Sequence, residues 1–187
     1  MLSRFSTKEL IFIAITATAL FVVDFMAGAW VIALTGIPLS GSFISPIIAG
    51  FFVIFLIRTV PKFGTMTFSL FIFGMLALPT ISAGPPGFWP KVIVEVLAGV
   101  SADTFLYLCR YKKWSIFVAF YVISTMLLYG LTFSMILMGI PESDKTLSIM
   151  PFVVLTWIAI GTVGLFLGLK SWERFKNYSI IKQICGT

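Results

Sequence analysis

The stretch that decides the fold is LIFIAITATALFVVDFMAGAWVIAL, residues 10–34. It is apolar for longer than the roughly 20 residues with which a helix crosses a bilayer, and a single charge, Asp24, interrupts it. Arg4 and Lys8 precede it as basic residues precede a signal sequence, but the run is too long for one and lacks a small-residue cleavage site. We therefore expect a retained first transmembrane helix.

The rest of the chain repeats this pattern. Apolar segments bounded by charge, Pro or Gly occupy residues 10–34, 43–57, 64–82, 90–108, 114–139 and 149–169. They predict an all-α integral membrane protein, a bundle of about six transmembrane helices that forms a single domain over residues 1–187. The second helix is expected to be short or broken, because Pro and Gly residues crowd its start.

The composition excludes a soluble protein. Hydrophobic residues make up 59% of the chain and charged residues 11%, whereas soluble domains carry about a quarter charged residues. The mean hydropathy is +1.09. Six spans nearly exhaust the 187 residues, so any function must lie within the bundle or on its loops.

The basic residues predict the orientation in the membrane. Eleven of the thirteen Lys and Arg residues fall on one side of the predicted topology, and only Lys91 and Lys145 fall on the other. Such a bias places the basic side in the cytoplasm, which predicts a multi-pass protein of the cell membrane with both termini cytoplasmic. Since the net charge of +6 resides in these short loops, we expect membrane lipid, and no nucleic acid, as its partner.

The sequence lacks the residues and motifs that several kinds of catalysis, metal binding and nucleotide binding require. The chain has no histidine, and its two cysteines, Cys109 and Cys185, lie near predicted cytoplasmic ends. No Walker loop and no GxSxG, HExxH or CxxC motif occurs. We therefore predict no catalytic residue, metal or cofactor, and no ATPase activity of the chain itself.

Ionisable residues inside membrane helices are costly and often functional. Asp24 lies midway along the first helix and has no partner nearby in sequence, so function and structural hydrogen bonding are equally open. Glu95 and Lys91 lie one turn apart on the fourth helix, either as an intrahelical pair or as a carboxylate that faces a ligand from outside. Asp103, near Arg110, is expected to make a structural ion pair or polar contact.

Aromatic residues in the predicted outer half could stack a flat ring beside Glu95. With the ionisable residues they form the predicted ligand-binding set: Glu95, Lys91, Trp89, Phe88, Trp30, Tyr129, Trp157 and Asp24.

Small residues on the first helix, namely Ala14, Ala17 and Thr18, lie three and four positions apart and allow close helix packing in lipid. Spacing leaves open whether they pack within the bundle or against another subunit.

Together these features resemble the S-components of energy-coupling factor (ECF) vitamin transporters, hydrophobic subunits of about this length that usually have six helices. The resemblance lies in the small-residue patch of the first helix and in the stretch from Gly84-Pro85-Pro86-Gly87 through Gly99, Asp103 and Arg110, which is similar to thiamine-related members. Thr18 stands where the family usually has the second of two paired alanines.

The resemblance implies capture of a vitamin or vitamin precursor, of thiamine-like or pyrimidine-like chemistry, from outside. A transmembrane coupling subunit, contacted through Ala14, Ala17 and Thr18, and separate ATPase subunits would drive uptake. Two alternatives remain: a non-catalytic assembly or helper subunit that binds partners through small-residue faces, and a membrane enzyme acting on a lipid-linked substrate with Asp24, Glu95 or Asp103 as acid or base.

Overall fold

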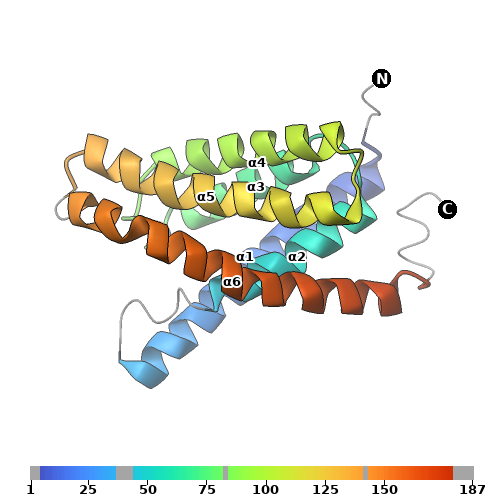
Figure 1. The fold of residues 1–187 in the computed structure, drawn as a ribbon, viewed down its shortest axis with the longest axis horizontal. Helices are drawn as coiled ribbons and strands as arrows, with labels where there is room; N and C mark the ends of the chain where they lie inside the picture. Colours follow the sequence, from blue (N-terminus) through green and yellow to red (C-terminus); the bar gives the residue numbers. More distant parts are fainter. Residues whose placement is uncertain (1–4, 37–43, 82–83, 141–142, 179–187) are drawn as a thin grey trace.

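The computed structural model describes residues 5–36, 44–81, 84–140 and 143–178. These residues form a bundle of six helices, which confirms the predicted all-helical class (Figure 1). The helices are α1 (Thr7–Thr35), α2 (Ser45–Thr59), α3 (Thr65–Ala77), α4 (Pro90–Leu108), α5 (Lys113–Leu137) and α6 (Ser143–Phe175).

The helices differ in their suitability for crossing a membrane. α1, α5 and residues Thr146–Phe175 of α6 are long and apolar enough to span one, and α2 and α3 are apolar but shorter. α2 is short, as expected, yet uninterrupted. α3 ends at Ala77 rather than at residue 82, since Pro79 cannot continue the hydrogen-bond ladder. α6 exceeds the predicted 149–169 at both ends, because its helix continues into polar sequence on either side of the apolar run.

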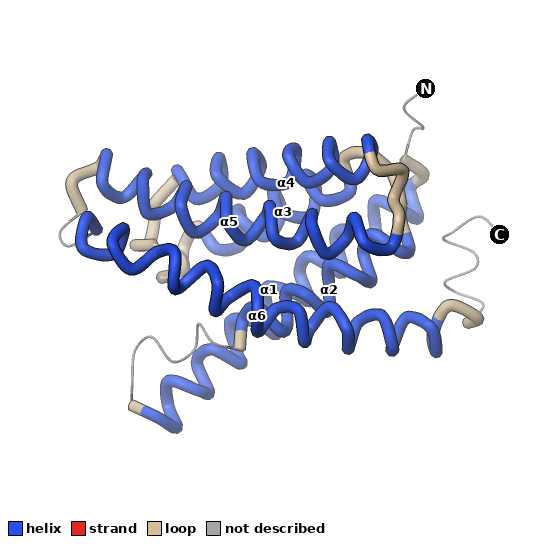
Figure 2. The backbone as a smooth tube through the Cα atoms, in the orientation of Figure 1, coloured by secondary structure: helices blue, strands red, loops and turns tan. Residues whose placement is uncertain are grey.

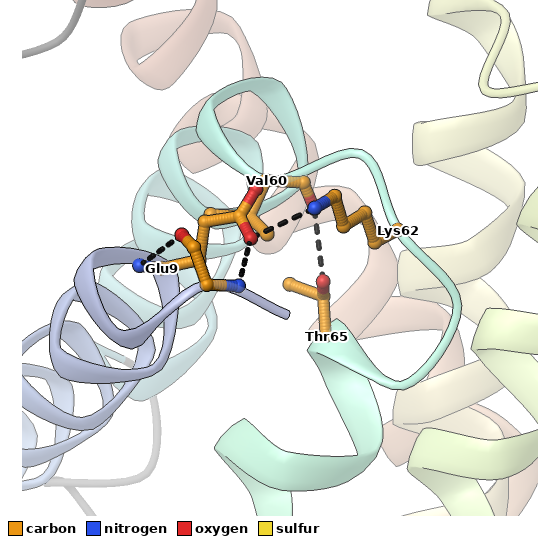
Figure 3. Close-up of polar contacts among 5 residues, drawn as sticks. Glu9, Val60, Lys62 and Thr65 are labelled. Atoms are coloured by element: carbon orange, nitrogen blue, oxygen red, sulfur yellow. Dashed lines mark hydrogen bonds and ion pairs between the residues drawn. The ribbon is translucent and has the colours of Figure 1, made fainter. Parts of the chain in front are cut away.

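A capping box starts α1. The Glu9 backbone N–H donates to Ser6 Oγ at 3.3 Å, and the Ser6 backbone N–H donates to Glu9 Oε2 at 2.7 Å. Lys62 Nζ, in the loop between α2 and α3, lies 2.8 Å from the same Glu9 oxygen (Figure 3). Thr65 Oγ1 closes this loop by donating to the Val60 carbonyl at 2.9 Å. The start of α1 is thereby joined to the α2–α3 loop.

Ionisable residues of α4 hold both ends of α3. At its N-terminus, the Asp103 carboxylate accepts hydrogen bonds from the backbone N–H groups of Met66 (3.1 Å) and Thr67 (2.8 Å) and from Thr67 Oγ1 (2.7 Å). At its C-terminal end, Lys91 Nζ donates to the carbonyls of Ala77 (3.0 Å) and Thr80 (3.1 Å). An anion at the N-terminus and a cation at the C-terminus both complement the helix dipole.

Glycines permit close packing of two helix pairs, α3 with α4 and α2 with α6. A Cβ added at Gly99 would lie 2.6 Å from the Thr67 Cα atom, so α4 approaches α3 where Asp103 binds. On α6, a Cβ at Gly164 would overlap the Ile47 backbone, and one at Gly168 would lie 2.9 Å from the Phe51 carbonyl oxygen. Such small-residue contacts replace the hydrophobic effect as the driving force for helix association in lipid.

The two halves of α1 differ in packing. Its buried residues are confined to the first half and end at Leu20. The second half extends away from the other helices (Figures 1 and 2), and its large side chains are exposed, with Trp30 at 67% and Leu34 at 78%. α1 begins at the same end of the bundle at which α6 finishes (Figure 1).

The hydrogen bonds by which Asp103 and Lys91 of α4 hold the two ends of α3, here called the clamp, give a stability prediction. Replacing Asp103 with Asn puts an amide N–H against a backbone N–H donor, and each lost hydrogen bond to a charged group is worth about 1.5–3 kcal/mol. We expect Asp103→Asn to lower the melting temperature of the detergent-solubilised protein. Glu173→Gln, at an exposed position on α6, serves as the control and should leave it unchanged. Equal melting temperatures for the two variants would show that the clamp does not stabilise the fold.

The contact between α2 and α6 gives a second prediction. Gly164→Leu cannot be accommodated without separating the helices, and overpacking of this kind costs about 1–3 kcal/mol. The variant should melt at a lower temperature than Val163→Leu, which adds bulk at the neighbouring, half-exposed position of the same helix. Thermal unfolding followed by circular dichroism measures both melting temperatures. Equal melting temperatures for the two variants would show that close packing of α2 against α6 at Gly164 does not stabilise the fold.

Candidate functional site

A cavity of about 270 Å³ lies inside the bundle, and all six helices contribute to its wall. Most of the wall is apolar, formed by Leu, Ile, Val, Met and aromatic side chains. Six polar residues interrupt this surface: Thr16, Asp24, Ser45, Ser69, Glu95 and Ser124. A largely apolar cavity with a few polar groups has the composition of a small-molecule site.

Three polar atoms of this wall are buried and have no hydrogen-bond partner within the described part of the chain. They are Asp24 Oδ1, Glu95 Oε2 and Ser124 Oγ. Buried polar groups in folded proteins nearly always have a partner, and an exception often marks a position that a ligand or water occupies. Three exceptions around one cavity therefore make it the candidate functional site.

Each of these side chains comes from a different helix. Glu95 lies on α4, and the absence of a side chain at Gly74 makes room for it, since a Cβ there would lie 3.4 Å from the Glu95 Cβ and Cγ atoms. Asp24 lies where α1 leaves the bundle, and the Ser45 side chain at the start of α2 hydrogen-bonds to its carboxyl group. Ser124 is a buried residue of α5.

The electrostatic character of the cavity is acidic. Asp24 and Glu95 both contribute carboxyl groups to the wall, and among the described residues no Lys or Arg does. Lys91, one turn from Glu95, directs its ammonium group to the α3 carbonyls instead.

The predicted ligand-binding residues divide into two groups. Asp24, Glu95 and Trp157 line the cavity. The other five predicted residues do not line it. Lys91 holds the end of α3, and Phe88 is buried, with 4% exposure, in the turn before α4. Trp89 and Trp30 are exposed at 58% and 67%, and Tyr129 is half-buried on α5.

Ser124 was not among the residues predicted from the sequence, nor were the other hydroxyl residues of the wall. Serine and threonine in membrane helices usually satisfy themselves by donating to the carbonyl one turn earlier. Ser101, Thr104 and Ser134 do so here, at 2.9, 2.7 and 2.7 Å. Ser124 does not, and residue type alone gives no sign of that difference.

The predicted partner-binding residues also separate. Ala17 is fully buried within the bundle, whereas Ala14 is half-buried and Thr18 is exposed. The latter two border an open hollow on the outer surface of the helix, together with Ile15, Ala19, Val22 and Val23. Internal packing therefore accounts for Ala17, while Ala14 and Thr18 are available to a neighbour.

Asp103 contributes to the fold and is absent from the cavity wall. Its carboxylate binds the first turn of α3, a polar contact of the structural kind expected from the sequence, although the partner is a helix terminus rather than Arg110. Within the described ranges, no group of three or more His, Cys, Asp or Glu side chains is arranged to hold a metal ion.

Comparison with known proteins supports the membrane assignment. No curated protein and no solved structure matches the chain. Residues 7–141, which include α1 to α5, match a family described as hypothetical bacterial integral membrane protein (Trep_Strep). The chain is therefore a member of the Trep_Strep family of bacterial integral membrane proteins.

Proposed function

We propose that this protein is the substrate-capture subunit of an ECF-type transporter, which binds a vitamin or vitamin precursor of thiamine-like or pyrimidine-like chemistry. The observation that carries the proposal is the cavity, whose wall contains three buried oxygens without partners in the described chain. A subunit that only held other proteins together would have no need for unsatisfied polar groups within its core, because each costs free energy.

The proposed topology supports capture from outside. Positive residues gather at the end where α1 begins and α6 finishes, and in this proposal that end faces the cytoplasm. Ser45 and Glu95 then lie in the outer turns of α2 and α4. The cavity extends from this level towards the middle of the bundle, where Ser124 lies.

Release into the cytoplasm requires an energy source that the chain does not contain, since no Walker loop is present. In this proposal separate ATPase subunits and a transmembrane coupling subunit supply it. The exposed face of α1 around Ala14 and Thr18 is where the coupling subunit would bind.

A second candidate, a membrane enzyme acting on a lipid-linked substrate, gains support from one observation: Asp24 and Glu95 face the same cavity. Paired carboxyl groups can act as acid and base. Mass spectrometry after incubation separates the two functions, because a capture subunit returns its ligand unchanged and an enzyme does not.

The first functional prediction is a ligand-dependent thermal shift. Purified protein screened against vitamins and their precursors should melt at a higher temperature with its ligand, because the folded state alone binds it. Trp157→Phe, which alters the cavity wall, should weaken the shift, whereas Trp114→Phe, at the exposed start of α5, should preserve it. If no compound shifted the folded protein, the capture function would be wrong.

A second prediction separates Glu95 from Asp103. Glu95 Oε2 has no partner in the described part of the chain, so Glu95→Gln removes an uncompensated buried charge and should leave the melting temperature of the ligand-free protein equal or higher. The same variant should lose the ligand-dependent shift. A fall in ligand-free stability as large as that of Asp103→Asn would assign Glu95 a structural role instead.

A further inference from the structure

The three oxygens without partners in the described part of the chain are directional features that the cavity offers a ligand. Asp24 Oδ1, Glu95 Oε2 and Ser124 Oγ belong to residues of α1, α4 and α5 that line the same cavity. Glu95 and Ser124 are nearly completely buried, at 3% and 1% exposure, so bulk water does not solvate them. The positions and hydrogen-bonding capacity of these three oxygens therefore determine which chemical groups of a ligand could bind in the cavity.

The charge around this space is uncompensated. Two carboxyl groups, those of Asp24 and Glu95, belong to its wall, and no Lys or Arg of the described residues does. Lys91 and Arg58, cations on the helices around the cavity, lie outside its wall: Lys91 binds the α3 carbonyls, and Arg58 lies at the far end of α2. A buried acidic pair without a positive partner is costly, and a cation placed between the two groups removes most of that cost.

The hydrogen-bonding capacity narrows the type of cation. Ionised carboxylates only accept hydrogen bonds, and a serine hydroxyl can accept as well as donate. A primary ammonium group carries three N–H donors and no acceptor, which matches one donor to each of the three oxygens. A quaternary ammonium has charge but no donor, and a neutral alcohol has a donor but no charge.

The aromatic part of the cavity wall indicates what the rest of the ligand, apart from its charged group, is like. Phe52, Phe73, Phe120 and Trp157 supply aromatic surface. Such rings pack against an aromatic or hydrocarbon group, and their faces attract cations. The volume of about 270 Å³ suits a single ring with a short side arm rather than a large cofactor.

We propose that the cavity binds a compact primary amine, whose ammonium group is held by Asp24, Glu95 and Ser124 and whose apolar or aromatic body packs among the phenylalanines and Trp157. This inference rests on the proposed capture function and specifies the class of its ligand.

Three probes of nearly equal shape test it: benzylammonium, benzyltrimethylammonium and benzyl alcohol, each titrated into the detergent-purified protein while its melting temperature is recorded. Benzylammonium should bind about ten-fold more tightly than either of the others, because a charge-assisted hydrogen bond is roughly twice as strong as a neutral one. Sodium chloride at matched ionic strength is titrated as a fourth probe.

Variants assign the effect to the three oxygens. Glu95→Gln and Asp24→Asn should each reduce the apparent affinity for benzylammonium about ten-fold, and Ser124→Ala by a smaller factor. Ser101→Ala, on the exposed side of α4, is the matched control and should bind as the parent does. Since Glu95→Gln is expected to fold at least as well as the parent, loss of binding cannot be attributed to unfolding.

The possible outcomes distinguish this inference from the capture function itself. Equal binding of the alcohol or the quaternary amine, unchanged binding by Glu95→Gln, or full stabilisation by Na⁺ alone would overturn the primary-amine site. If a neutral or anionic vitamin bound independently of Glu95, the capture function would stand and the amine inference would fail. If neither the vitamins nor the amines shifted the folded protein, both would be wrong.

Discussion

The rest of the structure depends on the way α4 holds α3. α3 is too short to cross a bilayer comfortably by itself, and water is scarce where its unpaired terminal N–H and C=O groups lie. Asp103 satisfies donors at one end and Lys91 satisfies acceptors at the other, twelve positions apart on a single helix. Gly99 then lets the two backbones approach closely enough for the carboxylate to reach.

This clamp explains why the cavity stays acidic. A lysine one turn from Glu95 could neutralise it, but the carbonyl oxygens at the end of α3 compete for the same ammonium group. The fully buried Lys91 is thus committed to the fold, and Glu95 is left without it. The ionisable residues of α4 therefore have different roles. Lys91 and Asp103 stabilise the bundle, whereas Glu95 remains available for a ligand.

Sequence reasoning succeeded where a local pattern carries the information. Hydropathy located six helices, and the cost of burying charge singled out Asp24 and Glu95, which both reached the cavity wall. It was less informative where the decisive contact is distant in sequence. Spacing suggested that Lys91 could pair with Glu95, but the carbonyls that bind it belong to another helix. The sequence does not distinguish Ser124 from a serine that donates to the carbonyl one turn earlier in its own helix. The packing role of the glycines on α6 follows only from the backbones of Ile47 and Phe51, which lie opposite them in the fold.

The continuity of α1 has a mechanical consequence. The helix runs unbroken for 29 residues, about 43 Å, with Asp24 beside the cavity and the exposed Ala14 and Thr18 face nearer its beginning. The buried residues of α1 lie in its first half and end at Leu20, while Asp24, one turn further on, still borders the cavity. Because an unbroken helix moves as one body, a displacement at Asp24 would also displace the Ala14 and Thr18 face of the same helix.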